Sequence, residues 1–141
     1  MTVVDASGHI AGRLASVLAK RLLLGEEISV VNAEKAIITG RRAWVFEEFR
    51  HRRDIGSSRK GPYYPARPER ILHRTIRGML PYQQPRGRSA LRRLRVYVGV
   101  PEALRDQPLE RFEAATRITT TRYATLAEIA RRLGAKFEGS R

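Results

Sequence analysis

Two short apolar runs in the first third of the chain flank a stretch with helical periodicity. Residues 3–5 and residues 28–31 are mostly apolar at consecutive positions, which is typical of strands buried on both faces. Between them, apolar residues recur at the spacing of one helix face over residues 10–22, and Gly25 follows as a stop signal. Residues 37–38 fit a short third strand. This β-α-β opening predicts a parallel sheet covered by helices on both faces.

The middle of the chain predicts two helices separated by an irregular segment. Thr39 can cap a helix over residues 40–53. Residues 56–65 are rich in Gly, Pro and Ser, which indicates a loop. Pro68 suits the first turn of another helix, which we expect to end near residues 78–81.

The last third combines a strand with a well-marked terminal helix. Apolar and polar positions alternate over residues 94–100, which predicts a strand. Thr125 and the glutamate three residues later have the spacing of a capping box, and Gly134 ends the helix that follows. Between these elements, residues 109–115 favour a short helix and residues 118–123 an extended segment.

Length and composition indicate one cytosolic domain over residues 1–141. The chain is 42% apolar and 30% charged, and it is long enough to bury a core. It contains no cysteine, which excludes disulfides, thiolate metal sites and cysteine catalysis. No apolar run approaches the roughly 20 residues of a membrane span, and the first residues lack the pattern of a secretory signal.

The positive charge is concentrated in residues 41–95. This region holds sixteen Arg or Lys residues against four acids, while the whole chain has a net charge of +14. Such self-repulsion destabilises a protein unless a polyanion neutralises it, and the simplest polyanion is a nucleic acid. Of the 28 basic residues 24 are arginine, whose planar guanidinium binds phosphate oxygens in pairs and stacks on bases. An arginine-rich genome or a hot habitat would also favour arginine, but neither explains why the charge lies in the middle.

The helix after Pro68 is predicted to present a row of guanidinium groups. At about 100° per residue, the arginines at 67, 70, 74 and 77 fall within a sector about 80° wide, and apolar residues lie opposite. We expect this face to contact phosphates; the alternative is a face that is merely solvated.

A second basic stretch follows over residues 85–95. Pro85 and Gly87 are expected to keep its first part extended, so that it can enter an RNA groove. Three tyrosines lie among the cations, where they could stack on unpaired bases or pack half-buried in the protein. The candidate RNA-binding residues are Arg41, Arg42, Arg50, Arg52, Arg53, Arg59, Lys60, Tyr63, Tyr64, Arg67, Arg70, Arg74, Arg77, Tyr82, Arg86, Arg88, Arg92 and Arg93.

The sequence offers no convincing active site. The segment at residues 7–13 follows the first strand, where dinucleotide enzymes carry their glycine motif, but Gly8 and Gly12 are four residues apart and no third glycine follows. These glycines fit a tight turn equally well. The three histidines, at positions 9, 51 and 73, are scattered, and no carboxylates near them suggest a metal site or an acid–base pair. We therefore expect no catalysis, cofactor or small-molecule substrate.

Several stretches resemble the ribosomal protein L13 family of the large subunit. They are VDASGHIAGRLAS at residues 4–16, VNAEKA at residues 31–36 and RTIRGMLP at residues 74–81. The similarity spans residues 3–137, and the downstream RGR and LRVYVGVP stretches fit the archaeal and eukaryotic branch. The long basic tail of eukaryotic members is absent, which favours an archaeal source. One departure follows Pro81, where relatives commonly carry a His-Lys pair and this chain has Tyr82-Gln83-Gln84; the tyrosine could stack instead.

The resemblance implies an α/β fold of three α/β/α layers around a four-stranded, mainly parallel sheet, with basic loops and extensions. It implies a structural protein of the cytoplasmic ribosome that binds large-subunit ribosomal RNA early in assembly, beside neighbouring ribosomal proteins and away from any membrane. The RNA-facing parts would be the arginine face at residues 67–77, the loop at 56–65 and the segment at 85–95. Two alternatives stay open from the residues alone: an enzyme that holds a nucleotide at the glycine turn, and a free regulator that binds RNA or DNA outside the ribosome.

Overall fold

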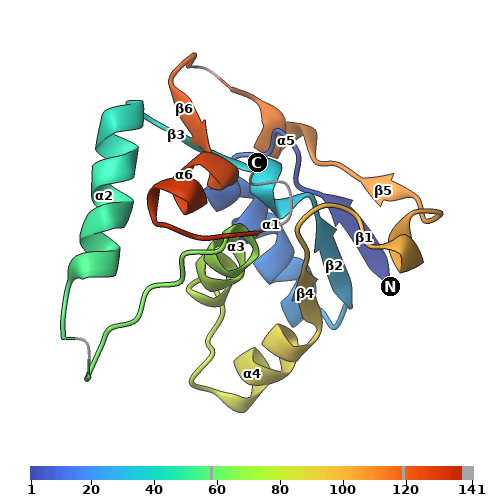
Figure 1. Cartoon of the computed structure of the whole chain (residues 1–141). Helices are drawn as coiled ribbons and strands as arrows, with labels where there is room; N and C mark the ends of the chain where they lie inside the picture. Colours follow the sequence, from blue (N-terminus) through green and yellow to red (C-terminus); the bar gives the residue numbers. More distant parts are fainter. Residues whose placement is uncertain (58, 119, 138–141) are drawn as a thin grey trace.

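A parallel four-stranded sheet forms the right half of the molecule in Figure 1. The computed structural model describes residues 1–57, 59–118 and 120–137. The strand order is β4-β2-β1-β5, and every neighbouring pair is parallel. The strands are β1 (Thr2–Asp5), β2 (Ile28–Val31), β4 (Leu94–Val96) and β5 (Leu109–Glu110).

Helices and a second, two-stranded ribbon surround this sheet. The α-helices are α1 (Ala11–Leu23), α2 (Arg42–Asp54), α3 (Pro68–Arg77), α4 (Pro85–Arg92), α5 (Glu113–Thr116) and α6 (Leu126–Arg132). The 3₁₀ turns are η1 (Ala33–Lys35) and η2 (Glu102–Leu104), and the ribbon pairs β3 (Ile37–Thr39) antiparallel with β6 (Tyr123–Thr125).

The sheet is buried on both faces, which explains why its strands carry consecutive apolar residues. Val4 and Val30 face the main core, which is formed with α1, α3 and α4, and Val3 and Val31 pack with Leu104 of η2 on the other side. This arrangement confirms the predicted α/β fold, in which helical structure covers both faces of a four-stranded sheet. The layer that contains η2 is the thinner of the two.

The first strands and three of the helices lie where the pattern predicted them. These are β1, β2, α1, α3 and α6. At the start of α6, the hydroxyl of Thr125 accepts a hydrogen bond from the Glu128 N–H, and the Glu128 carboxylate accepts one from the Thr125 N–H. The predicted capping box is therefore present.

The cap predicted for α2 is wrong. The residue before the helix is Arg41, not Thr39, and its side chain makes no capping bond. Gly40 intervenes with φ of +129°, a conformation that turns the chain out of β3 and separates Thr39 from the helix.

The extended segment predicted at Pro85 and Gly87 is also wrong, because both residues belong to α4. Pro85 occupies the first turn, where its missing N–H costs no hydrogen bond. Gly87 permits a very close approach to the preceding turn, since a Cβ there would lie 1.9 Å from the carbonyl oxygen of Pro81. The glycine therefore serves helix packing and not an extended chain.

One strand prediction and one helix prediction differ from the structure. The strand expected over residues 94–100 ends at Val96, because the chain then turns over η1: Asn32 donates to the Gly99 carbonyl, and the Gly99 N–H donates to Glu34. The short helix expected at residues 109–115 is divided between strand β5 and helix α5. A two-residue strand leaves no periodic signal, because only its pairing with β1 defines it.

Candidate nucleic-acid interface

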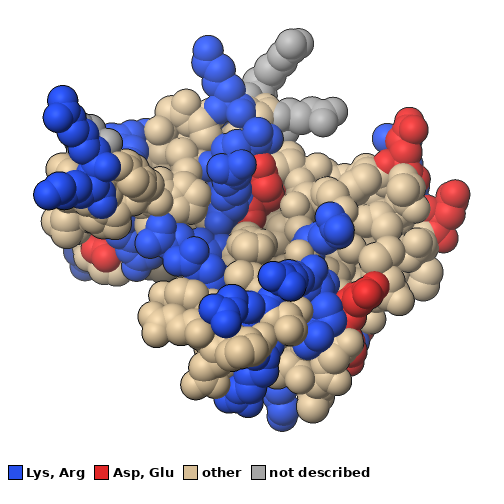
Figure 2. Space-filling model, turned by 90° about the horizontal axis from the view of Figure 1, so that it is seen from below, with Lys and Arg blue, Asp and Glu red and all other residues tan. Residues whose placement is uncertain are grey.

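The basic side chains gather on one broad surface. In Figure 2 they extend from the left of the view across its centre to its lower edge, while most of the visible acidic side chains lie at the right. The elements concerned are α2, the loop over residues 55–67, α3 and α4, and we call this the cationic surface.

Helix α3 has the two-faced character that the sequence predicted. Ile71, Leu72 and Ile76 are fully buried in the core, which fixes the rotation of the helix. The opposite side therefore carries its arginines outward, with Arg70 exposed. Arg67 is exposed too, but it pairs with Glu69 at 2.7 Å, which neutralises the first turn locally.

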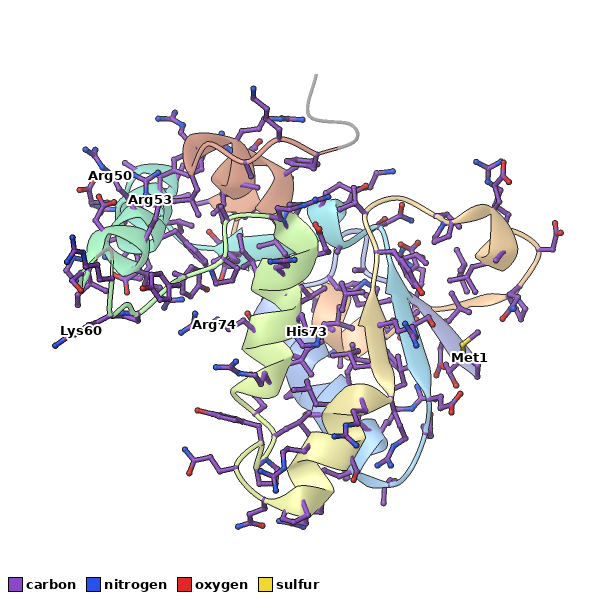
Figure 3. The ribbon with its side chains drawn as sticks, turned by 60° about the horizontal axis from the view of Figure 1, so that its bottom comes forward. Met1, Arg50, Arg53, Lys60, His73 and Arg74 are labelled. Atoms are coloured by element: carbon purple, nitrogen blue, oxygen red, sulfur yellow. The ribbon has the colours of Figure 1, made fainter. Side chains whose placement is uncertain are left out.

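Arg74 is held by the loop beside it (Figure 3). Its guanidinium donates a 3.1 Å hydrogen bond to the Tyr63 carbonyl and lies over the Tyr64 ring, 4.7 Å from the ring centre. Arg52 of α2 approaches the same ring at 5.8 Å. Tyr64 is half-buried, with an edge against Phe49. Of the two roles open to Tyr64, the structure favours packing, in which the ring supports two arginines.

The other two tyrosines are more exposed. Tyr63 has 64% of its surface exposed and Tyr82 has 38%. Arg77 lies over the Tyr82 ring, 4.6 Å from its centre. The tyrosine that departs from the family pattern after Pro81 therefore positions a guanidinium group at the surface through a cation–π contact.

Most arginines of α2 are oriented by partners. Arg42 pairs with Glu128 at 2.6 Å, Arg50 lies 3.8 Å from Asp54, and Arg52 lies 3.6 Å from Glu48. These exposed pairs contribute little stability, but they restrict the side chains. Arg53 donates to the Leu133 carbonyl at 3.2 Å and so connects α2 to the end of α6. Arg41 makes no ion pair with the described residues.

The loop, α3 and α4 supply the most accessible cations. Figure 3 shows Lys60 projecting from the loop at the lower left, and Arg50 and Arg53 at the upper side of α2. In the described part of the chain, no ion pair involves the exposed side chains of Arg59, Lys60, Arg70, Arg88 and Arg92. Arg86 is also exposed and contacts only the Gln84 side chain, at 3.4 Å.

Arg93 differs from its neighbour Arg92. It is half-buried, and its guanidinium donates a 2.8 Å hydrogen bond to the Leu22 carbonyl at the end of α1. The Leu22 carbonyl also accepts a 3.1 Å hydrogen bond from the Gly25 N–H. The position of Arg93 favours a structural role, because its bond connects the end of α4 to the end of α1.

One cation that the sequence analysis did not select joins the surface. Arg132 of α6 lies over the Phe46 ring at 4.6 Å and, with Arg50 and Arg53, lines a hollow of about 240 Å³. Its sequence signal was ambiguous, because basic residues are common in the last turn of any helix. Only the packing of α6 beside α2 brings it to this surface.

The glycine turn after β1 lies against Arg111. Arg111 pairs with Asp5 at 2.9 Å and donates to the Ser7 carbonyl at 2.8 Å, so a guanidinium covers the turn. Burial by itself would raise the pKa of Asp5, but the Ser7 N–H, the Asn32 amide and Arg111 together lower it, and the carboxylate repels phosphate. Gly8 has φ of +72°, which supports the simpler interpretation of a tight turn.

The histidines have structural surroundings. His9 is fully buried; its Nε2 accepts from the Phe112 N–H at 3.0 Å, and its Nδ1 lies 3.2 Å from the Ser7 carbonyl. Burial lowers the pKa of His9, and the nearby Arg111 adds to this effect. Burial lowers the pKa of His73 most, and the nearby Arg77 guanidinium lowers it further. His51 is exposed on α2. Among the described residues, no three His, Asp or Glu side chains form a group that could hold a metal ion.

Comparison with known proteins identifies the family. The model of the family described as ribosomal protein L13 matches residues 1–103. The chain belongs to the ribosomal protein L13 family. It is 57% identical over 94% of its length to the large ribosomal subunit protein uL13 of Archaeoglobus fulgidus, covering 87% of that protein. It is 51% identical to the protein of the same name from Methanococcoides burtonii and 49% to that from Methanocaldococcus jannaschii, in each case over 97% of this chain and all of the relative.

Membership of the L13 family confirms the expected archaeal type and a structural ribosomal role instead of an enzymatic one. It also confirms the expected location in the cytoplasmic ribosome. Within the described residues, no helix combines the length and hydropathy that crossing a bilayer requires.

The family motif at residues 74–81 has a clear physical basis in this structure. Ile76 and Leu80 are buried in the core, and Arg74 and Arg77 rest on the rings of Tyr64 and Tyr82. One short stretch therefore anchors α3 in the core and positions two guanidinium groups at the surface.

Proposed function

We propose that this member of the L13 family binds and braces large-subunit ribosomal RNA through the cationic surface. The observation that carries the proposal is the spread of guanidinium groups over α2, the 55–67 loop, α3 and α4, on helices whose other sides are fixed in one core (Figure 2). The RNA-facing region is residues 41–95, within the single domain of residues 1–141, and Arg132 is added to it.

The orientation of the arginines supports recognition of folded RNA. A flexible cationic tail neutralises charge but loses conformational freedom when it binds. Here Arg52, Arg74 and Arg77 already rest on aromatic rings, so less side-chain freedom is lost on binding. Planar guanidinium groups in fixed positions suit phosphates at fixed spacing.

Salt dependence of binding tests the proposal. If six to ten cations meet phosphates, affinity for large-subunit ribosomal RNA should fall about 10³- to 10⁵-fold between about 50 and 200 mM salt. Filter binding of the isolated protein to the transcribed RNA measures this directly. Binding that is indifferent to salt would contradict the proposal.

Charge-matched variants test which surface binds. Arg70→Gln with Arg88→Gln removes two exposed cations of the cationic surface, and Lys20→Gln with Arg105→Gln removes two exposed cations elsewhere. The first pair should reduce the slope of log affinity against log salt by about two, and the second should leave it nearly unchanged. Equal effects would mean that net charge matters and this surface does not.

We also propose binding early in subunit assembly, with neighbouring large-subunit proteins as later partners. The fold supports this order, because the cations are positioned by the protein's own core and do not require another protein to order them. Sedimentation of a lysate should find the chain in precursor particles of the large subunit as well as in mature ones. A chain found alone at the top of the gradient would favour the free regulator instead.

A further inference from the structure

The chain's single tryptophan lies on α2, within the cationic surface. Trp44 on α2 keeps 61% of its surface exposed, which is unusual for the largest apolar side chain. It lines a hollow of about 250 Å³ together with Gly12, Ile38, Glu48, Phe49 and Arg52. The side chains around most of this hollow are apolar, in contrast to the arginine-lined hollows nearby.

The turn before α2 lies beside the tryptophan. A Cβ at Gly40 would make ordinary van der Waals contacts, 3.8 Å from Cε3 of Trp44 and 3.4 Å from a methyl group of Val45. Gly12 of α1 has open space where its side chain would be, which leaves the hollow accessible from the α1 side. Trp44 therefore presents an indole ring at the edge of a preformed depression.

The hollow is continuous with the cationic surface through Arg52. This side chain lines the Trp44 hollow and also a second hollow of about 290 Å³ that it shares with Tyr64 and Arg74. The Arg52 guanidinium lies 5.0 Å from the centre of the Phe49 ring. A nucleotide whose phosphate meets Arg52 or Arg74 thus has an aromatic site within reach of its base.

We propose that the Trp44 hollow receives one unpaired base of the RNA bound on the cationic surface, so that this inference rests on the proposed function. Bases splayed out of RNA loops stack on aromatic rings. The adjoining charge favours a nucleic acid over an apolar protein segment, because Arg52 lines the hollow and Arg74 lines the neighbouring one. Glu48 at the edge of the hollow disfavours a phosphate inside it and can accept a hydrogen bond from an exocyclic amino group.

Tryptophan fluorescence provides a direct test, because Trp44 is the only tryptophan. The probes are a single-stranded oligocytidylate of about 12 nucleotides, the equivalent oligouridylate, and heparin, a polyanion without bases. Binding is followed separately by anisotropy of a labelled oligonucleotide. Oligocytidylate should quench Trp44 emission more strongly than oligouridylate, and heparin should displace the RNA without quenching.

Substitutions supply the energetic test. Trp44→Ala should weaken oligocytidylate binding about 5- to 150-fold, which corresponds to the loss of one stacked base. Trp44→Tyr should restore most of that affinity. Leu24→Ala removes an exposed apolar side chain at the end of α1 and should have no effect. Unchanged melting temperatures would show that the variants fold.

The outcomes separate this inference from the proposed function. RNA that binds with unchanged Trp44 emission would overturn the base site and leave RNA binding intact. Equal quenching by heparin would also overturn it. Absence of RNA binding in the unaltered protein would remove both proposals together.

Discussion

The Arg74 guanidinium lies over the ring of Tyr64, 4.7 Å from its centre, while donating a hydrogen bond to the carbonyl of the preceding residue, Tyr63. One side chain of α3 therefore holds the 55–67 loop by its backbone and by an aromatic ring. This contact connects the buried face of the helix to the exposed basic loop.

Arg74→Gln should loosen the loop without unfolding the protein. The substitution removes both contacts, and a shorter amide cannot replace the cation–π interaction. Limited trypsin digestion should cut faster after Arg59 and Lys60 in the variant. Arg70→Gln removes an exposed arginine of the same helix and should leave the cleavage rate unchanged; equal acceleration in both variants would contradict the role assigned to Arg74.

Adjacent arginines at the end of α4 should have different effects. Arg92 is exposed, while Arg93 donates to the Leu22 carbonyl. Arg92→Gln should leave stability unchanged and lower the salt slope of RNA binding by about one. Arg93→Gln should lower the free energy of unfolding by about 1 kcal/mol and leave the slope nearly unchanged. Urea unfolding and filter binding measure the two quantities, and identical behaviour of the two variants would refute the distinction.

Gly87→Ala should destabilise the fold. The new Cβ would lie 1.9 Å from the Pro81 carbonyl oxygen, so the turn between α3 and α4 must move, at a cost of about 3 kcal/mol. Gly12→Ala is the matched control, because its Cβ meets nothing within 4 Å. It should raise stability by up to about 1 kcal/mol through helix propensity. Urea unfolding of both variants provides the measurement.

Stability should fall as the pH drops below the ordinary histidine pKa of 6.5. Burial lowers the pKa of His9 in the folded state, so the unfolded chain binds the proton more readily. The neutral form is favoured in the fold, and its contribution is complete above pH 6.5 and declines below it. The pKa of His73 is also lowered in the folded state, so its contribution to stability declines with falling pH in the same way.

Thermal melts at a series of pH values test this dependence. His9→Gln should flatten the decline between about pH 6.5 and 5, although its melting temperature at neutral pH should be lower because a buried bond to Phe112 is altered. His51→Gln changes an exposed residue and should retain the full decline. A His9→Gln variant with an unaltered pH profile would mean that His9 does not cause it.

The sequence by itself determined the features that depend on local pattern. Charge counting located the basic region at residues 41–95, helical spacing oriented the arginines of α3 away from Ile76, and consecutive apolar residues marked the buried strands. The quoted motifs led to the L13 family, which the comparisons confirmed. Such signals are readable because helix faces and strand faces repeat over a few residues.

Only the tertiary structure decided what distant segments do to one another. Strand β5 exists through its pairing with β1, and Arg132 joins Arg50 because α6 packs beside α2. Arg92 and Arg93 are adjacent arginines, yet Arg93 donates a hydrogen bond to the Leu22 carbonyl at the end of α1 while Arg92 is exposed. The burial of a side chain and the identity of its partners depend on contacts between elements far apart along the chain. The local periodicity of the sequence does not encode these contacts.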